Sequence, residues 1–128
     1  MKLIKSSFEI LEQAPGIQGV KKQIEHAGRT CYKSEDKITD TSCEEFVSRM
    51  VNSGHGAMLE HGTVYLKIPY QYIDVSSKLE IPIMEDSVAK YTANHYSICT
   101  TINNIAYITT NYRVLVENGW LDDLQYQC

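Results

Sequence analysis

Paired arginines, closely spaced cysteines and long apolar runs are missing from this sequence. Only three of its 128 residues are arginine, and the net charge of −4 lacks the basic excess of a general nucleic-acid binder, so we expect no nucleic-acid partner. The four cysteines form no C-x-x-C pair, which argues against a zinc ribbon or a dithiol redox motif. No apolar run approaches the ~20 residues that span a membrane, so we expect no membrane partner.

A signal for secretion is also missing. Lys2 and Lys5 flank only two apolar residues, fewer than the hydrophobic region of a signal peptide requires. We therefore expect a cytoplasmic protein whose cysteines are reduced thiols. The hydrophobic share of 43% and the charged share of 22% are typical of a globular protein, and the chain length predicts a single domain over residues 1–128.

Apolar periodicity predicts an α+β fold, with a small mixed or antiparallel sheet packed against two or three helices. Strands are predicted near residues 8–11, 63–68, 96–102 and 105–110. Asn103 and Asn104 separate the last two strands, and asparagine tolerates a positive φ, which favours a tight hairpin there. Residues 70–95 are less regular, and the proline in Ile81-Pro82-Ile83 excludes a simple helix at that point.

Two helices are predicted in the first half of the chain. The first runs from Gly19 towards Tyr32, with apolar residues three and four positions apart on one stripe. The second covers residues 43–51, and Gly54 suits its C′ position. This helix is preceded by two possible capping boxes, Thr41-x-x-Glu44 and Ser42-x-x-Glu45.

A third helix is predicted over residues 112–118. Asn111 can act as its N-cap and Gly119 as its stop. Arg113 lies within this helix, and we assign it to a solvated face.

Residues 53–61 read S-G-H-G-A-M-L-E-H, which places two histidines, a carboxylate and two glycines directly after the second helix. One interpretation is a metal site, although His55 and His61 are six positions apart rather than the four that a zinc-binding helix uses. In a second interpretation Glu60 and His61 begin a strand, and a buried pair of the two pins the loop. In a third, this is a ligand-binding loop around His55, where glycines admit a close approach of the backbone.

Two separate segments of the chain resemble segments of one known family. Residues 54–61 read G-H-G-A-M-L-E-H, and residues 27–32 read A-G-R-T-C-Y. They are similar to the G-H-x-x-x-x-E-H and A-x-R-x-[SC] segments of the flavin-dependent thymidylate synthases (ThyX type). The order of strand, two helices, histidine loop and strand also fits, so residues 1–68 resemble the amino-terminal part of the family fold.

The resemblance implies conversion of dUMP to dTMP, in which methylene-tetrahydrofolate supplies the carbon and FAD, reduced by NADPH, supplies the hydride. It implies that His55, Gly56 and Ala57 border the FAD and that Arg29 and Cys31 lie near the flavin site. Small residues allow a flat ring to approach, and the planar fork of Arg29 can hold a phosphate. Two alternatives stay open: Arg29 as part of a surface salt bridge, and Cys31 as a core residue on the apolar stripe of its helix.

The family's Arg-His-Arg-x-x-S run, which grips flavin and nucleotide, is absent from this sequence. The three arginines are Arg29, Arg49 and Arg113, and no two of them are paired. Because the phosphates of FAD and dUMP need clustered cationic donors, we expect a fragment or truncated member that is weakly active or inactive alone. The family forms homotetramers, which implies self-association. The alternative is a non-catalytic α/β binding or scaffold domain that keeps the fold without the chemistry.

Overall fold

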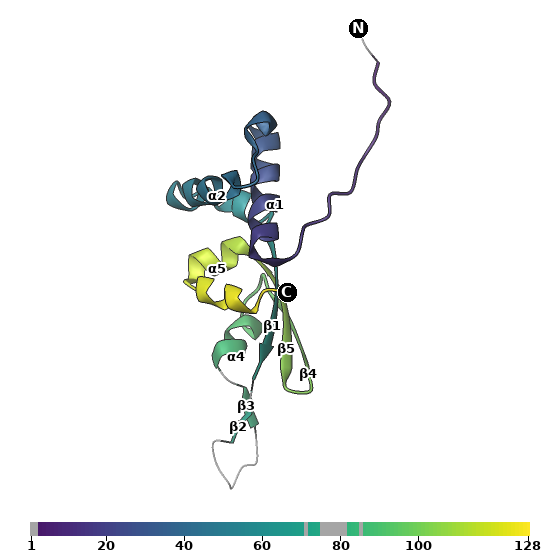
Figure 1. Ribbon diagram of the computed structural model, residues 1–128. Helices are drawn as coiled ribbons and strands as arrows, with labels where there is room; N and C mark the ends of the chain where they lie inside the picture. The colour runs from purple at the N-terminus through teal and green to yellow at the C-terminus, as the bar shows by residue number, and fades with distance from the viewer. Residues whose placement is uncertain (1–2, 71, 75–81, 85) are drawn as a thin grey trace.

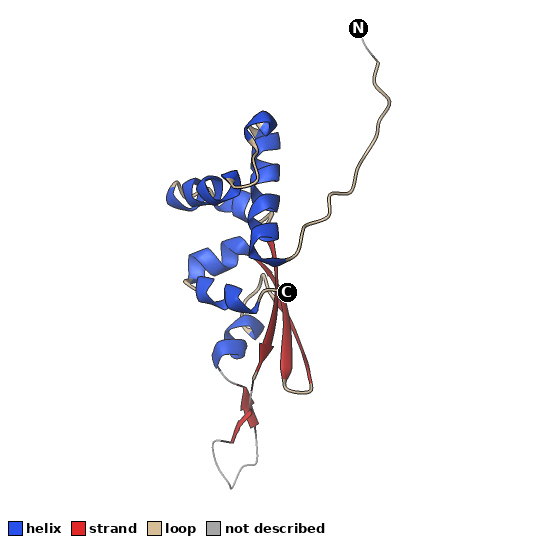
Figure 2. Ribbon diagram, in the orientation of Figure 1, coloured by secondary structure: helices blue, strands red, loops and turns tan. Residues whose placement is uncertain are grey.

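A three-stranded antiparallel sheet in the order β1-β5-β4 has α4 and α5 beside it on one side (Figure 1). The computed structural model describes residues 3–70, 72–74, 82–84 and 86–128. The strands are β1 (Thr63–Pro69), β2 (Tyr72–Asp74), β3 (Pro82–Met84), β4 (Ile98–Ile102) and β5 (Ile105–Asn111). The helices are α1 (Gly16–Cys31), η1 (Glu35–Lys37), α2 (Ser42–Asn52), α3 (Gly56–Leu59), α4 (Asp86–Thr92), α5 (Tyr112–Asn118) and η2 (Leu121–Tyr126). The predicted α+β class is confirmed, with a small antiparallel sheet and several helices (Figure 2).

The sheet forms because its strands alternate buried and exposed side chains, which gives one face to the core. In β1, the buried side chains of Val64, Leu66 and Ile68 alternate with exposed Tyr65 and Lys67. β5 pairs with β1 along its whole length and repeats the pattern. The buried residues of β5 are Ala106, Ile108 and Thr110. The predicted strands at 63–68 and 105–110 are confirmed.

β4 and β5 form the predicted hairpin. Asn103 has φ of 50° and Asn104 has φ of 62°, the left-handed conformation that asparagine tolerates. β4 begins at Ile98 rather than at residue 96 as predicted, because residues 96–97 belong to a turn. Both backbone N–H groups of that turn donate to Asn94, at 2.9 and 3.3 Å.

The three predicted helices are present. α5 covers the predicted residues, with Asn111 Oδ1 accepting from the Val114 N–H at 3.1 Å. Gly119 ends this helix with φ of 74°, and Gly54 follows α2 with φ of 72°. α1 begins earlier than predicted, at Gly16.

The predicted capping boxes before α2 are wrong. Its N-cap, Thr41, makes no side-chain capping bond. Ser42 Oγ instead accepts from the Thr39 N–H at 2.8 Å and donates to Glu25 Oε1 at 2.8 Å. The hydroxyl is used in this way because a buried carboxylate needs a donor.

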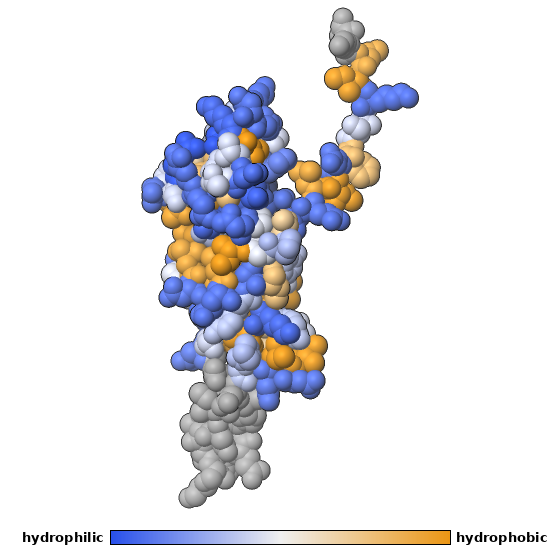
Figure 3. Space-filling model, in the orientation of Figure 1, coloured by the Kyte–Doolittle hydropathy of each residue, from blue (hydrophilic) through white to orange (hydrophobic). Residues whose placement is uncertain are grey.

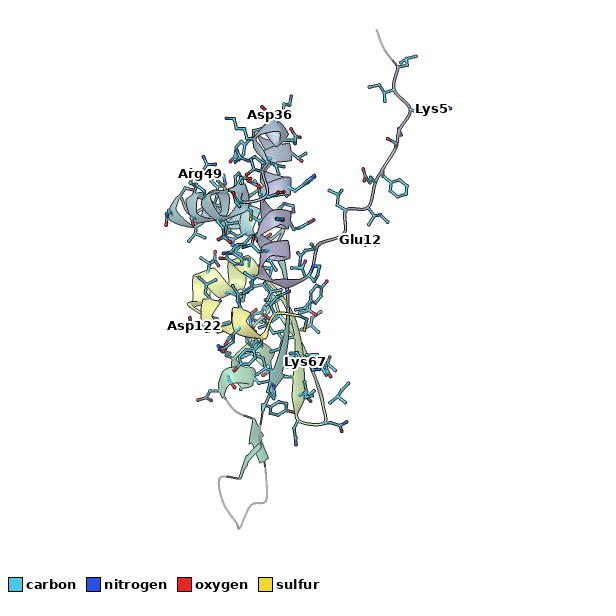
Figure 4. All side chains as sticks on the ribbon, viewed as in Figure 1. Lys5, Glu12, Asp36, Arg49, Lys67 and Asp122 are labelled. Atoms are coloured by element: carbon cyan, nitrogen blue, oxygen red, sulfur yellow. The ribbon has the colours of Figure 1, made fainter. Side chains whose placement is uncertain are left out.

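The predicted strand at residues 8–11 is also wrong. Residues 3–14 form neither helix nor strand, and Figure 4 shows Lys5 and Glu12 on a segment that extends away from the body of the molecule. A strand needs a partner to pair with, and none lies beside this segment among the described residues. Within the irregular region, Pro82 and Ile83 belong to β3, whereas Ile81 lies outside the described residues.

The core lies between the covered face of the sheet and the helices. Its largest fully buried apolar side chains are Tyr91, Ile24, Leu66, Ile68, Ile108 and Leu115. Each such side chain stabilises the fold by about 1.5–3 kcal/mol through burial. The four cysteines are not joined by disulfides. No helix within the described ranges is both long and apolar enough to cross a bilayer.

Candidate functional site

The histidine loop, residues 53–61, and the end of α1 meet in space although they are distant in sequence. The prediction of a loop throughout this segment is wrong, because Gly56–Leu59 form the short helix α3. The Tyr32 hydroxyl lies 3.2 Å from Nε2 of His55, and the two residues are 23 positions apart. Their rings also contact edge to face, with centroids 6.2 Å apart. Both side chains are exposed, so the contact lies at the surface of the molecule.

Glycines allow α1 to approach both α2 and the histidine loop. A Cβ atom on Gly28 would lie 2.3 Å from Cζ of Phe46 and 3.3 Å from Cγ of Met58. A Cβ atom on Gly62 would lie 2.7 Å from Cδ1 of Ile24. A side chain at either position would push α1 away from the loop. Gly28 and Gly62 were not among the predicted site residues, yet they determine its geometry.

Arg113 reaches the loop from α5. A Cβ atom on Gly56 would lie 2.6 Å from Nε of Arg113. Nη1 of the guanidinium donates to Glu60 at 2.6 Å, and Nε donates to Glu117 at 2.7 Å. The hydrogen bond to Glu117, followed by that to Glu60, raises the pKa of Arg113.

The assignment of Arg113 to a solvated face alone therefore needs correction, because its guanidinium packs on the loop. The signal that points to this contact is weak in sequence. Glu117 lies four positions after Arg113, which predicts an ion pair along the helix, but nothing local predicts the bond to Glu60.

A pocket of ≈ 280 Å³ opens beside this arginine. Its lining residues are Glu60, Tyr96, Asn111, Arg113, Val114 and Glu117. Two carboxylates face one guanidinium in this lining, and both already accept hydrogen bonds from it. The pocket therefore suits a phosphate poorly, because its cationic donors are engaged and its charge is negative.

Arg29 and Glu25 form a buried polar pair within α1. Their exposed fractions are 8% and 1%, and Arg29 Nη2 lies 3.5 Å from Glu25 Oε2. The Arg29 guanidinium carbon lies 4.8 Å from the centroid of the Phe46 ring. Its Nε is buried and has no hydrogen-bond partner within the described part of the chain. The surface salt-bridge interpretation of Arg29 is therefore wrong, and one buried donor is left unsatisfied.

The remaining predicted site residues lie at the surface. His55, Ala57 and Cys31 are exposed, and Gly56 is half-buried. The core interpretation of Cys31 is wrong, because α1 ends at this residue and the apolar stripe is no longer covered there. Loop residues and the last turn of α1 therefore present their side chains together at one surface.

Glu60 and His61 do not form the buried pair of the second interpretation. Both residues are exposed, and Glu60 binds Arg113. The structure gives no support to the metal interpretation. Within the described ranges, no group of three His, Cys, Asp or Glu side chains is close enough to hold a metal ion. The loop is held by Arg113 and by Tyr32 rather than by its own carboxylate and second histidine.

The arrangement offers an exposed imidazole beside exposed Ala57, whose small side chain leaves room for a flat ring. One turn before Tyr32, the buried guanidinium of Arg29 keeps an unsatisfied N–H donor. Comparison of the chain with protein-family models, with curated proteins and with solved structures finds no match.

Proposed function

We propose that this chain belongs to the flavin-dependent thymidylate synthases, as their amino-terminal part, and supplies one wall of a flavin site. One observation carries the proposal. The two segments that resemble the family, residues 27–32 and 54–61, meet at the contact between Tyr32 and His55. A chance resemblance in two segments gives no reason for them to share a surface, whereas a common cofactor site requires it.

The residues at this surface suit FAD. Ala57 presents little side-chain bulk to a ring face, and the His55 imidazole can stack on the ring or hydrogen-bond to it, whereas Gly56 packs on Arg113. Arg29 lies on the same turn of α1 as Cys31, and the planar fork of its guanidinium can donate to a phosphate oxygen. Bound FAD, reduced by NADPH, supplies the hydride that completes methyl transfer from methylene-tetrahydrofolate to dUMP. The residues named here bind and orient the cofactor.

The chain supplies too few free cationic side chains for the phosphates of the two ligands. Arg113 is already held by Glu60 and Glu117. Arg49 is exposed on α2, with its guanidinium carbon 5.7 Å from the Phe46 centroid. FAD carries a diphosphate and dUMP a phosphate, which Arg29 alone does not neutralise. We therefore propose that the other donors come from outside these 128 residues.

Flavin binding tests the proposal directly. The purified chain is titrated with FAD, binding is followed by quenching of flavin fluorescence, and bound flavin is quantified by absorbance after denaturation. We expect weak but saturable binding. His55→Ala and Arg29→Lys should each weaken it about tenfold, the effect of losing one hydrogen bond or ring contact of ~1.4 kcal/mol.

Arg49→Lys is the matched control, because Arg49 also lies over the Phe46 ring but on the exposed surface of α2. It should leave FAD binding unchanged. Equal losses from Arg29→Lys and Arg49→Lys would mean that both act by disturbing Phe46. A chain that binds no FAD in excess cofactor would contradict the proposal and would support the non-catalytic scaffold instead.

A further inference from the structure

The outer edge of β4 is open. β4 lies at one edge of the sheet, and within the described residues its backbone pairs only with β5. Its sequence, I-C-T-T-I, contains neither a charge nor a proline, the devices that usually protect an edge strand. Ile98 and Ile102 are 70% and 55% exposed. Such an edge is a template for a further strand.

The opposite edge of the sheet is covered by other parts of the same chain. The Cys128 N–H donates to the Tyr65 carbonyl at 2.9 Å, and the Tyr65 N–H donates to Gln127 Oε1 at 3.0 Å. The side-chain amide of Gln13 makes two hydrogen bonds of 2.9 Å with the backbone of Thr63. A further strand can therefore add beside β4 but not beside this part of β1.

The amino-terminal segment, residues 3–11, has the pattern of a strand without a partner. Ile4, Phe8 and Ile10 fall on one side of an extended chain, and the charged residues fall on the other. The three apolar side chains are 87%, 90% and 79% exposed, and they form part of the apolar surface on the protruding segment in Figure 3. Within the described residues, no hydrogen bond or ion pair engages this segment.

Two anchors hold the base of this segment away from β4 of its own chain. Gln13 binds the beginning of β1, and the Gly16 N–H donates to the Cys128 carbonyl at 3.3 Å. Both anchors lie on the β1 side of the sheet, whereas β4 lies beyond β5, and Figure 1 shows the segment leaving the molecule. A second copy has no such constraint, because its β4 edge can approach the protruding segment directly.

We propose that the amino-terminal segment of one copy adds as a fourth strand to β4 of a second copy, and that the exchange is reciprocal. Pairing satisfies the outward backbone groups of β4 and those of the segment that face it, and it covers Ile98 and Ile102 together with the apolar side of the segment. A reciprocal exchange closes the assembly as a two-fold dimer in which the β4 edge of each copy is covered. The inference rests on strand geometry alone and is independent of flavin binding.

Sedimentation equilibrium over a range of protein concentrations tests the dimer. Phe8→Lys changes the segment and Ile98→Lys changes β4, so the two variants alter the two sides of the contact. Phe8 is 90% exposed and Ile98 is 70% exposed, so each variant chain should still fold. Each should raise the dimer dissociation constant by about tenfold or more, as expected for a central apolar contact. Ile38→Lys is the matched control, because Ile38 is 38% exposed and lies outside both strands. It should leave the dissociation constant unchanged.

Isotope-filtered NOE spectra of a mixture of ¹⁵N-labelled and ¹³C-labelled chains identify the occupant of the edge. We expect NOEs between residues 3–11 and β4 that connect differently labelled chains. A monomer at every concentration would overturn the proposal. So would NOEs confined to one chain, or a dimer that Phe8→Lys and Ile98→Lys do not weaken.

Discussion

Single glycines control how closely the elements of the candidate site approach, and the neighbour of each glycine decides what a substitution does. At Gly28 the neighbour is the buried ring of Phe46, at 2.3 Å from the position of a Cβ. At Gly56 it is the guanidinium of Arg113, at 2.6 Å. A ring packed in the core has no room to move, whereas the end of a long, partly exposed side chain can swing away. The same substitution should therefore have different effects at the two positions.

Gly28→Ala is expected to lower the free energy of unfolding by about 1–3 kcal/mol, because the new methyl group overpacks the core at Phe46. Gly56→Ala is expected to lower it by less than about 1 kcal/mol, because the change displaces an exposed ion pair. Urea unfolding followed by circular dichroism measures both. Equal losses would mean that Arg113 is held as rigidly as Phe46.

Tyr91 couples the stability of the fold to alkaline pH. Its ring is fully buried and its hydroxyl donates to Asp123 Oδ2 at 2.6 Å, an oxygen that Lys90 Nζ also approaches at 2.7 Å. Burial, followed by the hydrogen bond to Asp123, raises the pKa of Tyr91 well above its ordinary value of 10.0. The stability it contributes is therefore fully present below about pH 10 and declines as the pH rises further, because the unfolded chain loses this proton first.

Tyr91→Phe should make the free energy of unfolding less dependent on pH above about pH 10. Urea unfolding at a series of alkaline pH values, for the wild type and the variant, measures the two slopes. Burial also raises the pKa of Tyr112, so the variant should keep part of the dependence. Identical slopes would contradict the assignment of this coupling to Tyr91.

Helix α5 depends on its two ends, because a helix of seven residues is too short to be stable alone. Asn111→Ala should cost about 0.5–2 kcal/mol through loss of the N-cap bond to the Val114 N–H. Gly119→Ala should cost about 1–2 kcal/mol, because this position has φ of 74°. Urea unfolding tests both. Asn52→Ala, at the exposed end of α2, is the control and should stay within about 0.5 kcal/mol of the wild type.

Among the helices and strands, those with a complete local signal could be predicted from the sequence. α5 has an N-cap, an apolar face and a stop glycine within a few residues, and β1 has strict alternation. The segment near residues 8–11 also has apolar alternation, but pairing requires a neighbour that the alternation does not identify. The capping boxes predicted before α2 do not form for a related reason. The Ser42 hydroxyl donates instead to the carboxylate of Glu25, which lies 17 positions earlier in the chain.

The whole molecule has one proposed flavin-binding wall without the cations that two phosphorylated ligands need. We therefore expect dUMP-dependent NADPH oxidation by the purified chain, with FAD and methylene-tetrahydrofolate present, to be at least about a hundredfold below that of a complete synthase, the usual effect of losing one charge-stabilising donor. A coupled absorbance assay of NADPH consumption, with dUMP omitted as the control, measures this. Turnover comparable to a complete synthase would contradict it.

The elements of the candidate site could be predicted, but the chemistry of its side chains depended on the folded chain. Periodicity and terminating glycines act over a few residues, so α1 and α2 could be predicted without a structure, whereas the residues of the short helix α3 were predicted as loop. The burial of Arg29, the contact of Arg113 with Gly56 and the contact of Tyr32 with His55 join residues from separate elements. Such contacts follow from how helices and sheet pack against one another, and packing is set by all the neighbours at once rather than by any local pattern.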